Sequence, residues 1–87
     1  MKVKDSFVLR KIAGSNVVVP IGSETADFNG MMTLNETGAM LFAMLNKDRS
    51  IDDLTNAMLS EYDVSAKEAE EDVKAFVETL EKAGMLE

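Results

Sequence analysis

Carboxylates are the only abundant side chains of this chain that could take part in catalysis or hold a metal ion. The 87 residues include 16 Asp and Glu but no His and no Cys, so there is no imidazole base, no thiolate nucleophile and no Cys/His zinc site. The densest acidic groups are Asp52-Asp53 and Glu70-Glu71-Asp72. Neither has the spaced oxygen ligands and turn glycine of a calcium loop, and adjacent helical residues point about 100° apart. We therefore expect a solvated acidic surface with no catalytic residue, metal site or cofactor, and not an independent enzyme.

The charges are divided unevenly along the chain. Residues 1–34 hold four basic and three acidic side chains, a net charge of +1, whereas residues 35–87 hold five basic and thirteen acidic side chains, a net charge of −8. Nucleic-acid binding depends on Lys and Arg against the phosphate backbone. The second part of the chain would repel phosphate, so a nucleic-acid partner is not expected.

Length and composition predict one small globular domain spanning residues 1–87. A hydrophobic fraction of 46% is ordinary for a folded chain, and the absence of cysteine excludes a disulfide framework. The longest apolar run, residues 39–45, is too short to cross a bilayer. No basic segment precedes an apolar stretch near the N-terminus, as it would in a secretory signal. We expect a cytoplasmic protein with no membrane partner.

The first third of the chain has the character of β-strands. Residues 7–13 and 17–21 are rich in β-branched and aromatic side chains and flank a turn cluster at residues 14–16, which predicts a hairpin. Asn29-Gly30 is a typical type I′ turn pair. It either joins two short strands or only opens the last one, residues 30–34, and the sequence leaves both alternatives open.

The remainder is helical, and each helix has a start signal. Asn35 is a favourable N-cap for a helix from Glu36 to about Lys47, and Ser50 with Asp53 has capping-box spacing for a second helix. A third helix should begin at Ser65, with Glu68 at the capping-box position, and end at a left-handed glycine, Gly84, from which Met85 turns back. Its apolar stripe consists of Ala69, Val73, Phe76, Val77, Leu80 and Ala83.

Together these elements predict an α+β, winged-helix-like fold, a three-stranded antiparallel β-sheet followed by three α-helices. At the residue level the chain resembles the coenzyme PQQ synthesis protein D (PqqD) family from about Phe7 to Leu86. The segments that carry the resemblance are residues 34–39 (LNETGA), 50–54 (SIDDL), 61–64 (EYDV), 72–77 (DVKAFV) and 84–86 (GML), together with Leu45 and Leu80.

The resemblance implies a recognition element for ribosomally synthesised, post-translationally modified peptides. Such a domain acts as a peptide chaperone: it binds the leader segment of a precursor peptide as an added β-strand and presents it to a modifying enzyme, often a radical S-adenosylmethionine enzyme. The implied peptide-binding residues are the strand Gly30, Met31, Met32, Thr33 and Leu34, and on the third helix Val73, Phe76, Val77 and Leu80. Met31 and Met32 face opposite sides of the strand, so only one of them can pack against the helices.

Two other functions are compatible with the expected fold. A winged-helix transcriptional regulator follows from fold alone, but the net charge of −8 over the helices opposes it. A structural or assembly subunit would use the same strand edge to form a homodimer, because exposed edges invite self-pairing.

Overall fold

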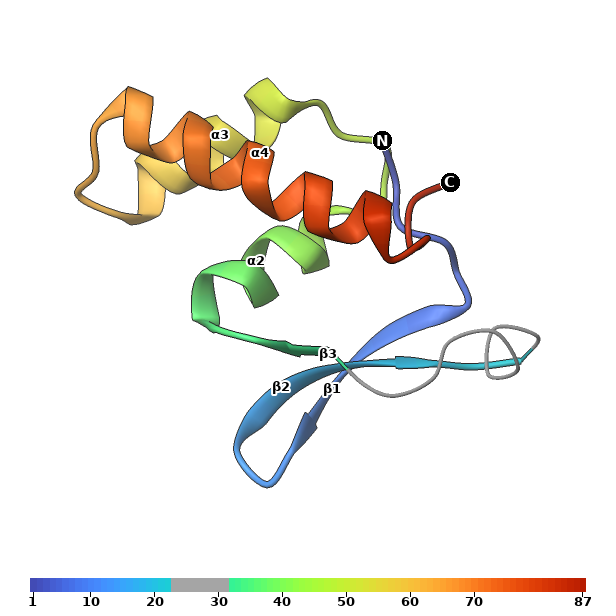
Figure 1. Ribbon diagram of the computed structural model, residues 1–87. Coiled ribbons are helices and arrows are strands. Elements are labelled where there is room, and N and C mark those ends of the chain that lie inside the picture. The colour runs from blue at the N-terminus through green and yellow to red at the C-terminus, as the bar shows by residue number, and fades with distance from the viewer. Residues whose placement is uncertain (23–31) are drawn as a thin grey trace.

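The computed structural model describes residues 1–22 and 32–87. In chain order its elements are β1 (Phe7–Ile12), β2 (Ser15–Pro20), β3 (Met32–Leu34), α2 (Glu36–Met44), α3 (Ile51–Glu61) and α4 (Ala66–Lys82). The helices lie on one side of the sheet, with α2 between the sheet and the pair formed by α3 and α4 (Figure 1). The prediction of a three-stranded antiparallel sheet followed by three helices is confirmed. The alternatives for Asn29-Gly30 concern residues outside the described part of the chain.

The sheet has the order β1-β2-β3, and both pairings are antiparallel. Ile12 pairs with Ser15, so the hairpin turn consists of Ala13 and Gly14 alone. Both have positive φ, 51° and 82°, as a two-residue type I′ turn requires. The turn predicted at residues 14–16 is therefore wrong by one residue, and β2 begins at Ser15.

Local hydrogen bonds define the helix ends much as the sequence predicts. Asn35 Oδ1 accepts from the Gly38 amide at 2.8 Å, and Ser50 and Asp53 form a complete, reciprocal capping box. At the end of α4, the Met85 amide donates to the Leu80 carbonyl and the Gly84 amide to the Glu81 carbonyl. With Gly84 at φ 72°, this is a Schellman motif. The first helix ends at Met44, earlier than the predicted Lys47.

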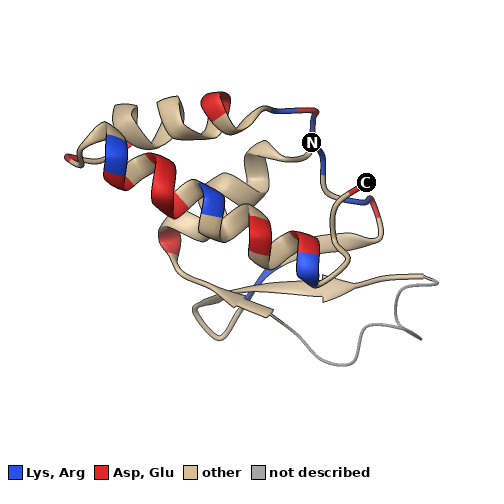
Figure 2. Ribbon diagram, turned by 45° about the horizontal axis from the view of Figure 1, so that its top comes forward, with Lys and Arg blue, Asp and Glu red and all other residues tan. Residues whose placement is uncertain are grey.

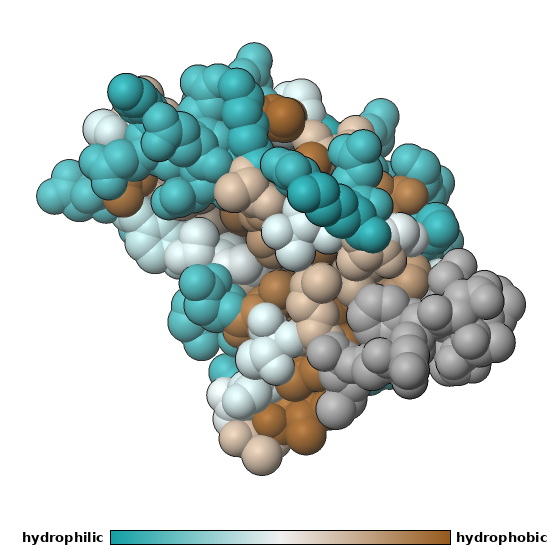
Figure 3. All heavy atoms as spheres, viewed as in Figure 1, coloured by the Kyte–Doolittle hydropathy of each residue, from teal (hydrophilic) through white to brown (hydrophobic). Residues whose placement is uncertain are grey.

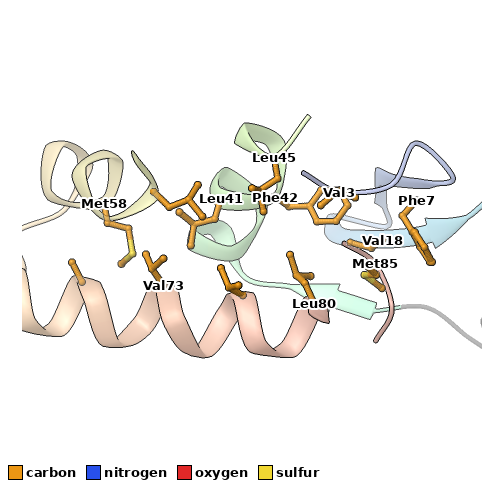
Figure 4. Packing of buried hydrophobic residues seen from close by; sticks show 13 residues of the cluster. Val3, Phe7, Val18, Leu41, Phe42, Leu45, Met58, Val73, Leu80 and Met85 are labelled. Carbon is orange, nitrogen blue, oxygen red and sulfur yellow. The ribbon is translucent and has the colours of Figure 1, made fainter. Parts of the chain in front are cut away.

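One hydrophobic core joins the sheet to all three helices (Figure 4). Val18 supplies its sheet side, Leu54 supplies α3, and Val73 and Leu80 supply α4, each with no exposed area. The two ends of the chain also close the core, because Val3 near the N-terminus forms a β-bridge with Leu86 near the C-terminus. α4 is thus held at a fixed position above the sheet by its buried stripe.

The capping box of α3 gives stability a dependence on acid pH. Hydrogen bonds from the Ser50 backbone amide and hydroxyl lower the pKa of Asp53 below its ordinary value of 3.8. A lowered pKa stabilises the fold at higher pH, and this stability is lost as pH falls through the folded-state pKa. Asp53→Asn is expected to lower Tm at neutral pH, and the Tm difference from the parent should shrink below pH 3.8, measured by circular dichroism.

Asp52→Asn is the matched control, since it removes the same charge from the same turn of α3 but leaves the capping box intact. An equal loss of Tm in both variants would show that the capping box has no specific role.

Candidate functional site

The outer edge of β3 is open to an added strand within the described residues, because β3 is the last strand of the sheet. In an antiparallel ladder, residues alternate between bonding to one neighbour and to the other. The Ile21 amide donates to the Ser6 carbonyl at 2.7 Å, so the odd-numbered residues of β2 face β1 and the even-numbered ones face β3. Val18 and Asn16 therefore bond to Met32 and Leu34 in the observed register. Thr33 directs its amide and carbonyl away from the sheet.

The start of α2 brings β3 close to α4. A Cβ atom built on Gly38 would lie 3.4 Å from Cβ of Leu34 and 3.4 Å from Cε1 of Phe76. The strand end, the first turn of α2 and the Phe76 ring therefore meet at Gly38. Both distances are ordinary van der Waals contacts, and the tightest contact of such a Cβ would be with Asn35 Oδ1, at 3.2 Å. The Phe76 ring is half-buried, so one side of it remains accessible.

A hollow of about 390 Å³ begins at this meeting point and extends between the three helices. Its apolar lining comes from all three, with Leu41 on α2, Met58 on α3 and Phe76 on α4. Its polar groups are Asn35, Thr37, Tyr62 and Asp72. On the face seen in Figure 3, the outer surface of the helices is hydrophilic, and hydrophobic residues gather beneath it towards the sheet. The open edge and the hollow thus adjoin, as a site for an extended peptide with apolar side chains requires.

The residues that the sequence assigned to this site differ in how much of their side chains is exposed. Met32 and Leu34 are half-buried and pack against the core, and Thr33 is exposed. Phe76 on α4 lines the hollow. Val73 and Leu80 have no exposed area and Val77 has 8%, so these three side chains hold α4 on the core and present almost no surface to a ligand.

Gly30 and Met31 lie outside the described residues. Met32 shares the core side of the sheet with its cross-strand partner Val18.

Sequence reasoning missed most of the lining of the hollow. Tyr62 follows α3 and is 36% exposed, and Val64 and Asp72 approach from the connection and from α4. The interruption of the helical pattern at Glu61-Tyr62-Asp63-Val64 is the only signal in the sequence that marks this region. It shows where α3 ends but not what the end of α3 faces.

The surface charge differs between the helices and the sheet (Figure 2). Along α4, Lys74 pairs with Glu70 at 2.7 Å and Lys82 with Glu78 at 2.9 Å, and the Glu70 hydrogen bond raises the pKa of Lys74. The remaining acids of α4 leave it strongly negative. Within residues 1–22 and 32–87, no group of three or more acidic side chains is placed to hold a metal ion. No helix in this part of the chain is long and apolar enough to span a membrane.

Comparison with known proteins gives one family and two similar structures. The sequence model of the family described as coenzyme PQQ synthesis protein D (PqqD) matches residues 15–86. The structure of TbiB1 in complex with the TbiA(beta) leader peptide has a TM-score of 0.79 and 22% identity, covering 100% of this chain and 95% of that one. The structure of lasso peptide synthetase B1 complexed with the leader peptide has a TM-score of 0.75 and 25% identity, covering 97% of this chain and 93% of that one. Among curated protein sequences, none matches this chain.

Proposed function

The chain belongs to the PqqD family, and from this premise we propose that it binds the leader segment of a ribosomally synthesised precursor peptide. The leader adds as a strand to the outer edge of β3 and places apolar side chains in the hollow beside Phe76. The bound leader is then presented to a modifying enzyme, for which a radical S-adenosylmethionine enzyme is the leading candidate. In this role the chain is a carrier and not a catalyst.

The observation that carries the proposal is that Thr33 directs its amide and carbonyl outward one residue before Leu34, which lies beside Gly38 in the lining of the hollow. A peptide strand bonded to the outward-directed amide and carbonyl of Thr33 runs along the side of β3 that faces away from β2. Its alternate side chains point towards the helices, where Leu34 and Phe76 lie in contact distance of Gly38. The two similar structures are complexes with leader peptides, which supports a leader peptide as the ligand of this chain.

Neither the edge nor the hollow is sufficient alone. A backbone hydrogen bond contributes about 0.5–1.5 kcal/mol net, and micromolar affinity corresponds to about 8 kcal/mol. Fully burying one large apolar side chain adds about 1.5–3 kcal/mol. A leader that reaches micromolar affinity therefore needs several hydrogen bonds at the edge and at least one apolar anchor in the hollow.

The direct test is a titration of the isotope-labelled chain with the leader of the precursor peptide encoded nearest to this chain's gene. We expect the amide shifts of Met32, Thr33 and Leu34 and those around Phe76 to change together and to saturate. Shifts confined to other surfaces, or no shifts, would contradict the proposal.

Phe76→Ala is expected to weaken leader binding by about tenfold or more, because truncating an aromatic anchor commonly costs about 2 kcal/mol. Phe76→Leu, which keeps most of the apolar volume, should retain most of the affinity, and calorimetric titration measures both. Leu59→Ala is the control, since Leu59 is 37% exposed on α3 and is not part of the lining of the hollow. If Phe76→Ala binds the leader with unchanged affinity, α4 does not form a wall of the binding site.

A homodimer through the β3 edge is the second candidate, favoured by the same outward-directed backbone groups of Thr33, with which no strand of the described residues pairs. Mass measurement with and without leader separates the two. A dimer that dissociates when the leader is added supports leader binding, whereas a dimer that the leader leaves intact supports an assembly role.

A further inference from the structure

Among the described residues the sheet has a second open edge, on β1. The alternation that directs Thr33 outward on β3 makes Val8, Arg10 and Ile12 bond to β2. Leu9 and Lys11 therefore direct their amides and carbonyls away from the sheet, and within the described residues no further strand pairs with them.

A second hollow, of about 380 Å³, adjoins this edge. Phe7 and Leu9 line it from β1, and Phe42, Ala43 and Asn46 line it from α2 and the turn after it. Phe7 and Phe42 are only 4% and 6% exposed, so they form an apolar floor, whereas Ala43 and Asn46 are exposed at the rim. A strand added beside Leu9 and Lys11 would direct its alternate side chains into this hollow. The β1 edge thus repeats the arrangement of the β3 edge: an unpaired strand next to an apolar hollow walled by a helix.

The charge around β1 has the opposite sign to that of the helices. Arg10 and Lys11 are exposed, and residues 6–22 contain no Asp or Glu. Asp5 and Lys4 also line the hollow, and Asp5 shares Lys2 with Glu87, at 2.9 and 2.7 Å. Residues 35–87 carry a net charge of −8. An acidic segment would therefore be attracted to the β1 edge and repelled from the helices that wall the β3 edge.

We propose that the β1 edge and the hollow beside α2 form a second strand-addition site, which takes an extended segment with carboxylates flanking an apolar side chain. The segment is supplied by the enzyme that modifies the precursor, an assignment of the occupant that rests on the proposed function. Since β1 and β3 are opposite edges of the sheet, the leader and the enzyme segment bind together. Each partner then occupies one edge, and the sheet links the leader to the enzyme.

The site is tested with a short synthetic peptide in which valine alternates with glutamate, titrated into the isotope-labelled chain. We expect shifts at Leu9 and Lys11 and at Phe42 and Ala43, with leader affinity unchanged when both peptides are present. The double variant Arg10→Glu/Lys11→Glu should weaken binding of the acidic peptide about tenfold, since reversing two exposed charges turns attraction into repulsion. The double variant Lys67→Glu/Lys82→Glu on the exposed surface of α4 changes the net charge by the same four units and should have no effect. With the enzyme and precursor present, the Arg10→Glu/Lys11→Glu variant should lower the rate of modification while leader affinity stays unchanged.

Three results would overturn the β1 site itself, whatever its occupant. They are shifts of the acidic peptide at Thr33 and Phe76 instead of β1, equal binding of a peptide with lysine in place of glutamate, and no binding at millimolar concentration. If the free chain forms a dimer with Leu9 and Lys11 in its interface, the occupant of the β1 edge is a second copy of the chain and not a segment of the enzyme. An unchanged rate of modification in the Arg10→Glu/Lys11→Glu variant would exclude the enzyme as the occupant. Failure of the leader to bind at β3, with the acidic peptide still bound at β1, would instead contradict the proposed function and leave the second site standing.

Discussion

Leader binding is expected to fall about a hundredfold when Thr33 is replaced by proline. Thr33 directs its amide away from β2, so proline removes no hydrogen bond from the sheet, but it removes the donor that meets an added strand. One lost hydrogen bond of about 1 kcal/mol and a peptide carbonyl left unpaired, at about 1–3 kcal/mol, together weaken binding by about 2.7 kcal/mol or more. Calorimetric titration with the leader measures this loss.

Thr33→Val is the matched control, because it changes the side chain and keeps the backbone amide. Valine also suits a strand, so leader affinity should stay within a few-fold of that of the parent chain. Circular dichroism and the amide spectrum of β2 establish whether the proline variant keeps its sheet. A folded Thr33→Pro chain that binds the leader normally would exclude strand addition at β3.

The largest loss of stability is expected from Leu80→Ala. Leu80 has no exposed area, and its carbonyl also accepts from the Met85 amide at the end of α4. Replacing a fully buried leucine by alanine costs about 2–5 kcal/mol, and a domain of this size has a free energy of unfolding of about 4–13 kcal/mol. Urea denaturation should therefore show a loss of about 3 kcal/mol.

Leu59→Ala is the control for the core as well, since Leu59 is 37% exposed and its truncation should cost less than about 1 kcal/mol. Comparison with Phe76→Ala separates packing from binding. Leu80→Ala should lower leader binding mainly in proportion to the fraction of chains that are unfolded. Phe76→Ala should lower leader affinity even under conditions in which all chains are folded. A loss below about 1 kcal/mol in Leu80→Ala would show that α4 is not fixed by this contact.

Features that depend on neighbouring residues could be predicted from the sequence. Ser50 with Asp53 and Gly84 with Met85 act through hydrogen bonds that span a few residues, so their spacing alone reveals the helix ends. The hairpin turn begins one residue earlier than the sequence predicts, because its first position is Ala13, at φ 51°. A residue with a Cβ atom rarely adopts that conformation, and the glycine beside it carried the only signal.

The site is formed by contacts between residues far apart in the sequence, and these contacts can be predicted from the sequence only in part. The apolar stripe of α4 identifies Val73 and Leu80 as residues that face something apolar, and in the structure this is the core. Which flank of the stripe borders the hollow depends on how α4 is rotated about its axis. That rotation is set by α3 and the start of α2, which bring Met58 and Gly38 to the same hollow as Phe76. Periodicity within one helix contains no information on this arrangement.

The central claim is that a leader strand bonds to the outer edge of β3, and one measurement tests it most directly. It is the scalar coupling across a hydrogen bond between the Thr33 amide and a carbonyl of the leader, recorded on a complex with both chains isotope-labelled. The account predicts a coupling at Thr33, together with contacts between the leader and the Phe76 ring. A saturated complex with no coupling at Thr33, and with the leader in contact with other elements only, would contradict it.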